Sequence, residues 1–294
     1  MKNRLQITTI LLVCIIALFC GVFLVPMFCG ILISFTDWNG LSRDYSVIWF
    51  DNYVRMFRDA RFLESLGVTL RYLCILLPST LIAGYASAKA IYRLRRFQSG
   101  LLFLSFFPYV ITPIIACILW NQIYIGLVPE IAELLGIQAI KGNLLADKGT
   151  ALFAVAFVDL WMLVPYAMLL YLSALNGIPK ELLEYAQIEG ANSRQIAMYI
   201  ESPYILSTVG MLTTVVSSYA FTHIDTLMTL TSGGPGRATE TLYYTIYKNS
   251  TLEQRYAYGL AEGLIVAFGS IGIFLMVNKL TNGDHLNVIT TSSD

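Results

Sequence analysis

Six long apolar segments alternate with shorter polar ones along this chain of 294 residues. A helix needs about 20 mainly apolar residues to cross the hydrocarbon core of a bilayer. The pattern therefore predicts six membrane-spanning helices, near residues 9–34, 66–90, 99–122, 150–174, 203–226 and 257–280. An even number of spans places both chain termini on the same side of the membrane.

The composition agrees with a membrane protein. Hydrophobic residues make up 56% of the chain and charged residues 13%, with a mean hydropathy of +0.65, whereas a soluble domain carries about a quarter charged residues. The formal net charge of zero gives no sign of nucleic-acid binding. The five cysteines lie in apolar runs without a CxxC pair, which indicates packing residues. The histidines, His223 and His285, have no metal-ligand spacing.

The first apolar segment is too long for a cleaved signal peptide. No charge interrupts it from Leu5 to Thr36, while the core of a signal sequence covers about 7–15 residues. We therefore interpret it as the first membrane-spanning helix.

The distribution of Lys and Arg bears on the orientation in the membrane. Lys and Arg gather in short cytoplasmic loops, but their totals on the two sides are equal here. The dense cluster "YRLRR" at 92–96 favours cytoplasmic termini.

The polar segment 175–202, between the fourth and fifth spans, carries strong local helix signals. Pro179 suits the first position of a helix, where its missing N–H is not needed. Gly190 permits a chain reversal. Asn192 and Gln195 have the spacing of a capping box at the start of a second helix. The segment therefore predicts a short helix, a turn and a second helix that leads into the fifth span.

The first of these two helices combines apolar and acidic residues. Its apolar residues are Leu182, Leu183, Ala186 and Ile188. One interpretation is an amphipathic loop that lies on the bilayer surface. The other is a helix that docks into a groove on a soluble partner. The residues alone leave both open.

The same segment resembles a known family motif. "EYAQIEGA" at 184–191 and "IESP" at 200–203 look like the EAA loop of permease subunits in binding-protein-dependent ABC importers. That consensus has Glu-Ala-Ala, Asp-Gly-Ala and an Ile-x-Leu-Pro step, and the matching residues here are Glu184, Ala186, Gly190, Ala191, Ile200 and Pro203. The departures are Tyr185, Glu189 and Ser202.

Further landmarks extend the resemblance over nearly the full chain. "SALNGIPKELLEYA" and "TLTSGGPGRATETLYYTIYKNS" are similar to segments of the sugar-permease branch, and so are "SFTDWNG", "FDNYVRMF" and "FLESLGVTLRY" in the N-terminal third. Because these landmarks occur in order, the chain is identified as a member of the MalF/UgpA-like carbohydrate permeases. The glycines of "GGPG" at 233–236 indicate a tight turn.

The resemblance implies an all-α integral membrane protein with six transmembrane helices, the type I ABC importer permease fold, and a cytoplasmic coupling helix between helices 4 and 5. It implies a second permease, two ATPase subunits and an extracytoplasmic solute-binding protein, in a bacterial or archaeal cytoplasmic membrane. ATP and Mg belong to the ATPase, because this chain lacks the GxxxxGK[ST] sequence. The expected ATPase-coupling residues are Glu181, Leu182, Glu184, Tyr185, Ala186, Glu189, Gly190, Ala191 and Pro203.

The expected organisation has three parts: an N-terminal helix and extracytoplasmic segment at 1–65, a five-helix permease core at 66–281, and a short cytoplasmic tail at 282–294. The outer segment 35–65 mixes Asp, Arg and aromatic residues. It suits an interfacial helix or a contact with the binding protein, and we favour the interfacial helix.

Ionisable residues inside the spans are candidates for the solute path, because burying a charge in a membrane is costly. Sugars also need hydrogen-bond acceptors and aromatic platforms. The candidates are Glu262, Asp159, Tyr219, His223, Asp225 and Tyr166. Each also has an ordinary explanation, as an interfacial group, a helix cap or an internal hydrogen-bonding residue.

Other kinds of membrane protein fit less well. An ABC permease for a non-carbohydrate solute is the main alternative. An ion-coupled secondary transporter would need its own ion sites, and no pair of carboxylates at the membrane centre stands out. An intramembrane protease would need a nucleophile beside a base, but Ser217 and Ser218 do not share a helical face with His223.

Overall fold

The computed structural model describes the backbone of residues 2–94, 98–137 and 142–290, and the side chains of residues 9, 11–94, 98–137 and 142–279. Arg95 and Arg96 of the basic cluster lie outside the described residues, as do the side chains of the predicted tail at 282–294. The described elements are helical apart from an isolated bridge between Thr36 and Val47.

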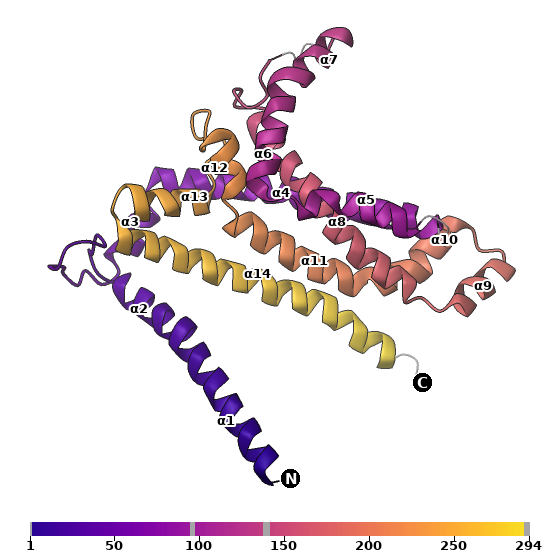
Figure 1. Ribbon diagram of the computed structural model, residues 1–294, viewed down its shortest axis with the longest axis horizontal. Coiled ribbons are helices and arrows are strands. Elements are labelled where there is room, and N and C mark those ends of the chain that lie inside the picture. The colour runs from indigo at the N-terminus through magenta and orange to yellow at the C-terminus, as the bar shows by residue number, and fades with distance from the viewer. Residues whose placement is uncertain (1, 95–97, 138–141, 291–294) are drawn as a thin grey trace. The chain divides into compact units, whose positions relative to one another are not determined.

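The helices are labelled in Figure 1, and four π-helical segments among them are named η. In chain order they are α1 Lys2–Phe19, η1 Cys20–Leu24, α2 Val25–Ile33, α3 Asp51–Met56, α4 Ala60–Arg93, α5 Gln98–Val110, α6 Pro113–Gln122, η3 Ile123–Leu127, α7 Val128–Leu134, α8 Ala151–Asn176, α9 Lys180–Ile188, α10 Ser193–Ile196, η5 Ala197–Glu201, α11 Ser202–Thr222, α12 Asp225–Thr231, α13 Leu242–Tyr247, η6 Lys248–Leu252 and α14 Tyr256–Thr290.

Within the described residues, six helical stretches are long and apolar enough to cross a membrane. They run over Leu11–Ile33, Ala60–Arg93, Pro113–Leu134, Ala151–Asn176, Ser193–Thr222 and Tyr256–Lys279. The first, second, fourth and sixth confirm the spans predicted at 9–34, 66–90, 150–174 and 257–280. The third and fifth differ from their predicted bounds.

The single helix predicted over 99–122 is wrong. Two helices, α5 and α6, occupy that stretch, and Thr112 between them has an extended backbone with φ −65° and ψ 143°. Pro113 explains the break, because a proline ring disfavours the helical conformation of the residue before it. The third membrane-crossing helix therefore begins at Pro113 and continues to Leu134.

The fifth span, predicted at 203–226, begins and ends earlier than expected. The helix is continuous from Ser193 through α10, η5 and α11 to Thr222. It ends where His223 adopts an extended backbone, with φ −83° and ψ 136°. The second helix of the polar segment is therefore the beginning of the fifth span itself.

Three of the π-helical segments stand directly before a proline. Pro26, Pro129 and Pro203 each occupy one of the first two positions of the α-helix that follows η1, η3 and η5. A proline lacks the N–H and clashes with the carbonyl four residues earlier. The wider π turn relieves that clash: after η5, the Ser202 N–H bonds to the Ala197 carbonyl.

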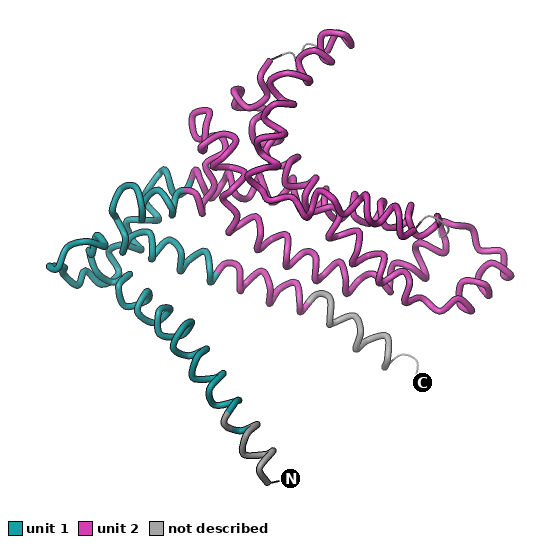
Figure 2. The backbone as a smooth tube through the Cα atoms, in the orientation of Figure 1, with its two compact units in different colours: residues 1–63, 245–268 teal, residues 64–244, 269–294 magenta. Residues whose placement is uncertain are grey.

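The chain divides into two compact units, shown in teal and magenta in Figure 2. Unit 1 comprises residues 1–63 and 245–268. Within it, the buried amide of Asn52 donates hydrogen bonds to the Ser34 and Thr36 carbonyls, both at 2.8 Å. These bonds hold the segment between α2 and α3 together. The helical part of 35–65, where the sequence predicts an interfacial helix, consists of the six residues of α3 and the start of α4.

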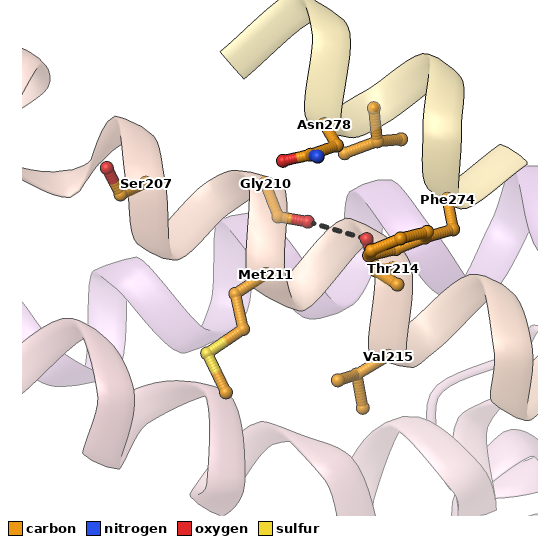
Figure 3. Close-up of a pocket in the computed structure, with 8 residues that line it drawn as sticks. Ser207, Gly210, Met211, Thr214, Val215, Phe274 and Asn278 are labelled. Atoms are coloured by element: carbon orange, nitrogen blue, oxygen red, sulfur yellow. Dashed lines mark hydrogen bonds between the residues drawn. The ribbon is translucent and has the colours of Figure 1, made fainter. Parts of the chain in front are cut away.

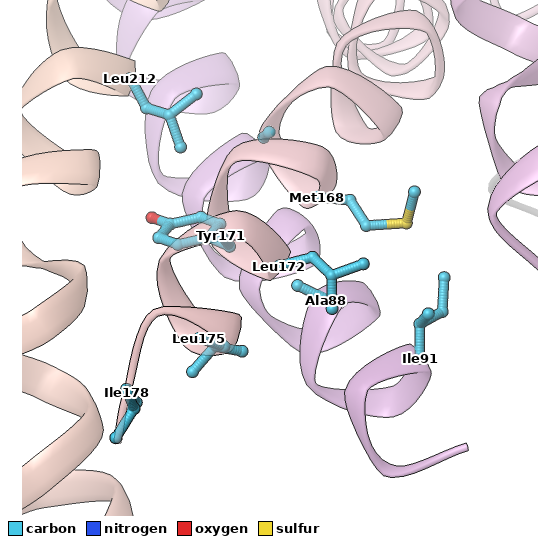
Figure 4. Packing of buried hydrophobic residues seen from close by; sticks show 9 residues of the cluster. Ala88, Ile91, Met168, Tyr171, Leu172, Leu175, Ile178 and Leu212 are labelled. Carbon is cyan, nitrogen blue, oxygen red and sulfur yellow. The ribbon is translucent and has the colours of Figure 1, made fainter. Parts of the chain in front are cut away.

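Unit 2 comprises residues 64–244 and 269–294 and is built around α8. In the most apolar 18-residue stretch of α8, 61% of the residues are buried. The corresponding share is 33% or less in the other candidate spans. α5, α6, α11 and α12 contact α8. α4 also packs on it, and Figure 4 shows Ala88 and Ile91 of α4 beside Met168, Tyr171 and Leu172 of α8.

The predicted tight turn at 233–236 is confirmed. Gly233 and Gly236 have φ of +80° and +53°, a region that L-residues with side chains rarely adopt. A Cβ on Gly233 would also lie 2.7 Å from the ring of Tyr244. Glycine at this position thus serves both the backbone conformation and the close approach of an aromatic side chain.

Candidate functional site

The loop between α8 and α11 has the helix–turn–helix form that the sequence predicts. α9 spans Lys180–Ile188, and Pro179 is the residue just before it, one position earlier than expected. Gly190 has φ +81° and reverses the chain. The capping box is confirmed: the Asn192 side chain accepts from the Arg194 and Gln195 N–H groups, and the Gln195 side chain accepts from the Asn192 N–H.

We call residues 180–196, where the sequence analysis expects ATPase-coupling residues, the coupling loop. Its predicted contact residues are mostly exposed: Glu181, Leu182, Glu184, Tyr185, Glu189 and Gly190 are exposed, Ala186 and Ala191 half-buried, and Pro203 beyond the loop is exposed. Leu183 alone packs against the hydrophobic core. Tyr185 and Ile188 are 68% and 81% exposed. The loop thus presents apolar side chains outward while one leucine anchors it to unit 2.

A partly buried charged cluster lies beside the coupling loop, and the sequence analysis did not anticipate it. The Glu201 carboxylate accepts from Lys89 Nζ at 2.7 Å and from the Tyr85 hydroxyl at 2.6 Å. The available signal was Glu201 itself, a charged residue at the unspecified position of the Ile-x-Leu-Pro step. A carboxylate next to a membrane span needs a partner.

Asp159 lies at the centre of a second buried cluster, which we call the Asp159 cluster. Its carboxylate is fully buried. It accepts hydrogen bonds from the Tyr72, Tyr219 and Thr226 hydroxyls, the last two at 2.8 Å. Asp159 therefore joins α4, α8, α11 and α12 through side chains, and sequence reasoning missed Tyr72 and Thr226.

Two more of the predicted path residues lie beside this cluster. The His223 ring stacks on Tyr219 at 4.1 Å between ring centroids, and its Nε2 lies 3.5 Å from the Asp159 carboxylate. Burial lowers the pKa of the His223 imidazole below its usual value, with the Asp159 carboxylate opposing that shift. Asp225, at the start of α12, is exposed.

The remaining path candidates lie elsewhere. Tyr166 stacks on Tyr109 of α5, with ring centroids 5.6 Å apart and planes 14° apart. Glu262, in unit 1, is fully buried and accepts from the Asn249 amide at 2.9 Å. The structure therefore brings Asp159, Tyr219 and His223 together, and leaves Tyr166 and Glu262 with other partners.

The described residues also enclose a groove of about 280 Å³ in unit 2 (Figure 3). Its lining comes from α11 and the later part of α14, with Ser207, Thr214 and Asn278 as polar members. Thr214 donates to the Gly210 carbonyl at 3.1 Å, so its hydroxyl already has a partner. Among the described residues, no group of three or more His, Cys, Asp or Glu side chains could hold a metal ion.

These features define a class: a multi-pass helical membrane protein with an exposed loop held in a fixed shape between two spans. A family model described as "Binding-protein-dependent transport system inner membrane component" matches residues 79–282. The chain belongs to this family, so it is a permease component of a transport system and not an enzyme. The expected carbohydrate-permease resemblance is confirmed.

Relatives are named as permeases. The multiple sugar-binding transport system permease protein MsmF of Streptococcus mutans is 31% identical over 251 residues, which cover 85% of this chain and 86% of that protein. The diacetylchitobiose uptake system permease protein NgcF of Streptomyces coelicolor is 31% identical over 287 residues, covering 91% and 81%. The sn-glycerol-3-phosphate permease protein UgpA of Shigella flexneri is 30% identical, covering 78% and 77%.

A solved structure shares the fold. A bacterial ABC transporter involved in the import of the acidic polysaccharide alginate aligns with a TM-score of 0.83, at 19% identity, and the match covers 95% of this chain and 96% of that one. The predicted fold, an ABC importer permease with six membrane helices, is confirmed.

Proposed function

We propose that this chain forms half of the translocation path of an ATP-driven importer for a sugar or a related glycoside or polyol. Support comes from relatives named for multiple sugars, diacetylchitobiose and glycerol phosphate. The solute is delivered by an extracytoplasmic binding protein. A second permease, a different chain from this one, completes the path.

The exposed apolar face of the coupling loop carries the proposal. Tyr185 and Ile188 are largely exposed on α9, while Gly190 and the capping box fix the shape of the loop. A rigid helix with apolar side chains facing outward fits a groove on a partner protein. That partner is a separate ATPase, present in two copies, which binds ATP and Mg.

The topology follows from the same assignment. An ATPase works in the cytoplasm, so the coupling loop and both chain termini face that side. Lys89 and Arg93 at the end of α4 line one pocket together with Leu183 and Ile196 of the loop region. The loop after α4 therefore lies on the same side of the membrane, as six spans require.

The solute path includes the polar residues near the outer end of α11. Tyr219, His223 and Asp225 offer an aromatic platform, an imidazole and an exposed carboxylate to the hydroxyls of a sugar. Asp159 does not contact the solute but holds the Tyr219 and Thr226 side chains in place through its hydrogen bonds. Tyr166 and Glu262 are further candidates on α8 and α14.

The test is photocrosslinking in the assembled importer. A photoreactive amino acid at Ile188 should crosslink to the ATPase subunit. The same group at Leu41, an exposed leucine of the outer loop that is 73% exposed, should not. Absence of a crosslink at Ile188 in a complex that contains the ATPase would contradict the coupling role.

Uptake into proteoliposomes tests the energy source. Import should need internal ATP and the external binding protein, and it should continue when ion gradients are abolished. Import driven by an ion gradient without ATP would instead identify a secondary transporter. A binding protein that recognises only a non-carbohydrate solute would support the alternative of a different ABC permease.

A further inference from the structure

The Lys89–Glu201 cluster is the best-defined charged feature that the proposed function does not use. Glu201 is 7% exposed, and the side chains of Lys89 and Glu201 are 20% and 10% exposed. Besides its 2.7 Å contact with Glu201, Lys89 Nζ donates to the Tyr85 hydroxyl at 3.3 Å. Three groups thus share one partly buried network.

The network joins α4 to η5, the segment that follows the coupling loop. Lys89 belongs to the last turns of α4, and Glu201 is the last residue of η5. A pocket of about 160 Å³ is lined by both residues together with Leu183 and Gln187 of α9, and Ser193 and Ile196 of α10. α9 and α10 lie at one end of unit 2 in Figure 1.

The same network is tied to the core. The Tyr85 ring packs edge-on against Tyr171 of α8, with centroids 5.7 Å apart, and Tyr171 belongs to the hydrophobic cluster of Figure 4. Glu201 is therefore held from one side by α4 and, through Tyr85, by α8. Its own backbone belongs to the helix that leads from the coupling loop into the membrane.

An ion pair that is withdrawn from water adds little net stability, because the cost of desolvation offsets the attraction. Loss of one partner is nevertheless costly, because it leaves an unpaired charge. Such a pair therefore resists separation of the two elements that it joins. The ion pair is therefore suited to keep α4 and the helix that contains Glu201 together during a movement.

We propose that the Lys89–Glu201 ion pair holds α4 against the helix that leads from the coupling loop into the fifth span, and that both residues therefore act as positioning residues. When the ATPase displaces α9, the pair makes α4 move together with α11. Without the pair, displacement of the loop moves α11 but not α4. ATP hydrolysis is then only partly coupled to opening of the translocation path. This inference rests on the proposed function.

The experiment uses the complete importer, with binding protein and ATPase, in proteoliposomes. Glu201→Gln and Lys89→Met each remove one charge. We expect the ATPase to remain associated and solute imported per ATP hydrolysed to fall about fivefold or more. The charge exchange Lys89→Glu with Glu201→Lys should restore the ratio to within about twofold of the unmodified importer, as coupled neighbours do in a double-mutant cycle.

The matched control is Arg237→Gln. Arg237 pairs with Glu64 at 3.1 Å, but those side chains are 51% and 60% exposed. Loss of that exposed pair should leave the transport ratio unchanged, since exposed pairs contribute little. If the single-charge variants fail to assemble, Tyr85→Phe is the second variant. It removes one hydrogen bond to Glu201, keeps the ion pair, and should lower the ratio about twofold.

An unchanged ratio in Glu201→Gln and Lys89→Met would overturn the proposal. So would a lowered ratio that the charge exchange does not restore, and so would an unchanged ratio in Tyr85→Phe where the other variants do not assemble. Failure of the proposed function is a separate result: the unmodified importer would then show no ATP-dependent uptake, or no crosslink at Ile188.

Discussion

The Asp159 cluster and the coupling loop both lie in unit 2, and they differ in where their side chains find partners. Asp159 is fully buried and takes hydroxyl hydrogen bonds from three other helices. The coupling loop satisfies its backbone within a few residues, through the turn at Gly190 and the capping box at Asn192. Its apolar residues Tyr185 and Ile188 remain exposed.

The difference separates two tasks. The buried cluster joins helices that are far apart in sequence, so it contributes to the fold of the unit. The loop is shaped locally and leaves an apolar face uncovered, a surface that the proposed ATPase contact would cover. Substitutions in the cluster should therefore change stability first, and substitutions in the loop should change transport first.

Asp159→Leu should have the largest effect. It would leave the Tyr72, Tyr219 and Thr226 hydroxyls without their acceptor, and unsatisfied buried groups should lower the free energy of unfolding by about 2–4 kcal/mol. Thermal unfolding of the purified chain in detergent measures this. Asp159→Asn is the matched control and should lose less, because its amide oxygen still accepts. Equal melting temperatures for Asp159→Leu and the unmodified chain would contradict the structural role.

Gly84→Ala tests the packing of α4 on α8 with a single methyl group. A Cβ at Gly84 would lie 2.6 Å from the Ala167 Cβ, so overpacking should cost about 1–3 kcal/mol of stability. Gly100→Ala in α5 is the matched control: a Cβ there meets nothing within 4 Å. That variant should be neutral or slightly stabilising, because alanine favours helix over glycine. Thermal unfolding should show a clear loss of stability for Gly84→Ala and no loss for Gly100→Ala.

Gly190→Ala should have the smallest effect on stability and a clear effect on transport. The φ of +81° is unfavourable for alanine, which should cost about 1 kcal/mol or shift the shape of the loop. ATPase association and solute uptake should both fall. Gly136→Ala carries similar backbone strain at φ +68°, outside the coupling loop, and also meets no neighbour. Equal uptake in the two variants would contradict a special role of the loop.

The sequence predicted most spans well, even where they contain proline: Pro78 and Pro165 lie inside the helices α4 and α8. At Pro113 the run of apolar residues continues while the helix stops, because backbone sterics override hydrophobicity there. The coupling loop was predictable almost residue by residue, since glycine at a reversal and Asn-x-x-Gln at a cap act within one turn. Only the place of Pro179 shifted, by one position.

The polar partners were not predictable in the same way. Asp159 was a candidate because a charge in a span is unusual, but nothing in the sequence links it to Tyr72 or Thr226. The same holds for Glu262 and Asn249, and for Glu201 and Lys89. A side-chain hydrogen bond depends on which helix faces meet, and a single sequence does not record those contacts.

By itself the sequence determined that the chain is an all-α membrane protein, that it has six spans, and that a capped loop stands between the fourth and fifth. These follow from local quantities: hydropathy over about 20 residues and turn chemistry over about four. Tertiary structure alone decided that α8 forms the centre of unit 2, that Asp159 is enclosed by hydroxyls, and that Glu201 meets Lys89. In a membrane protein, buried polar groups are satisfied by whichever helix packs against them, so their partners exist only in the folded chain.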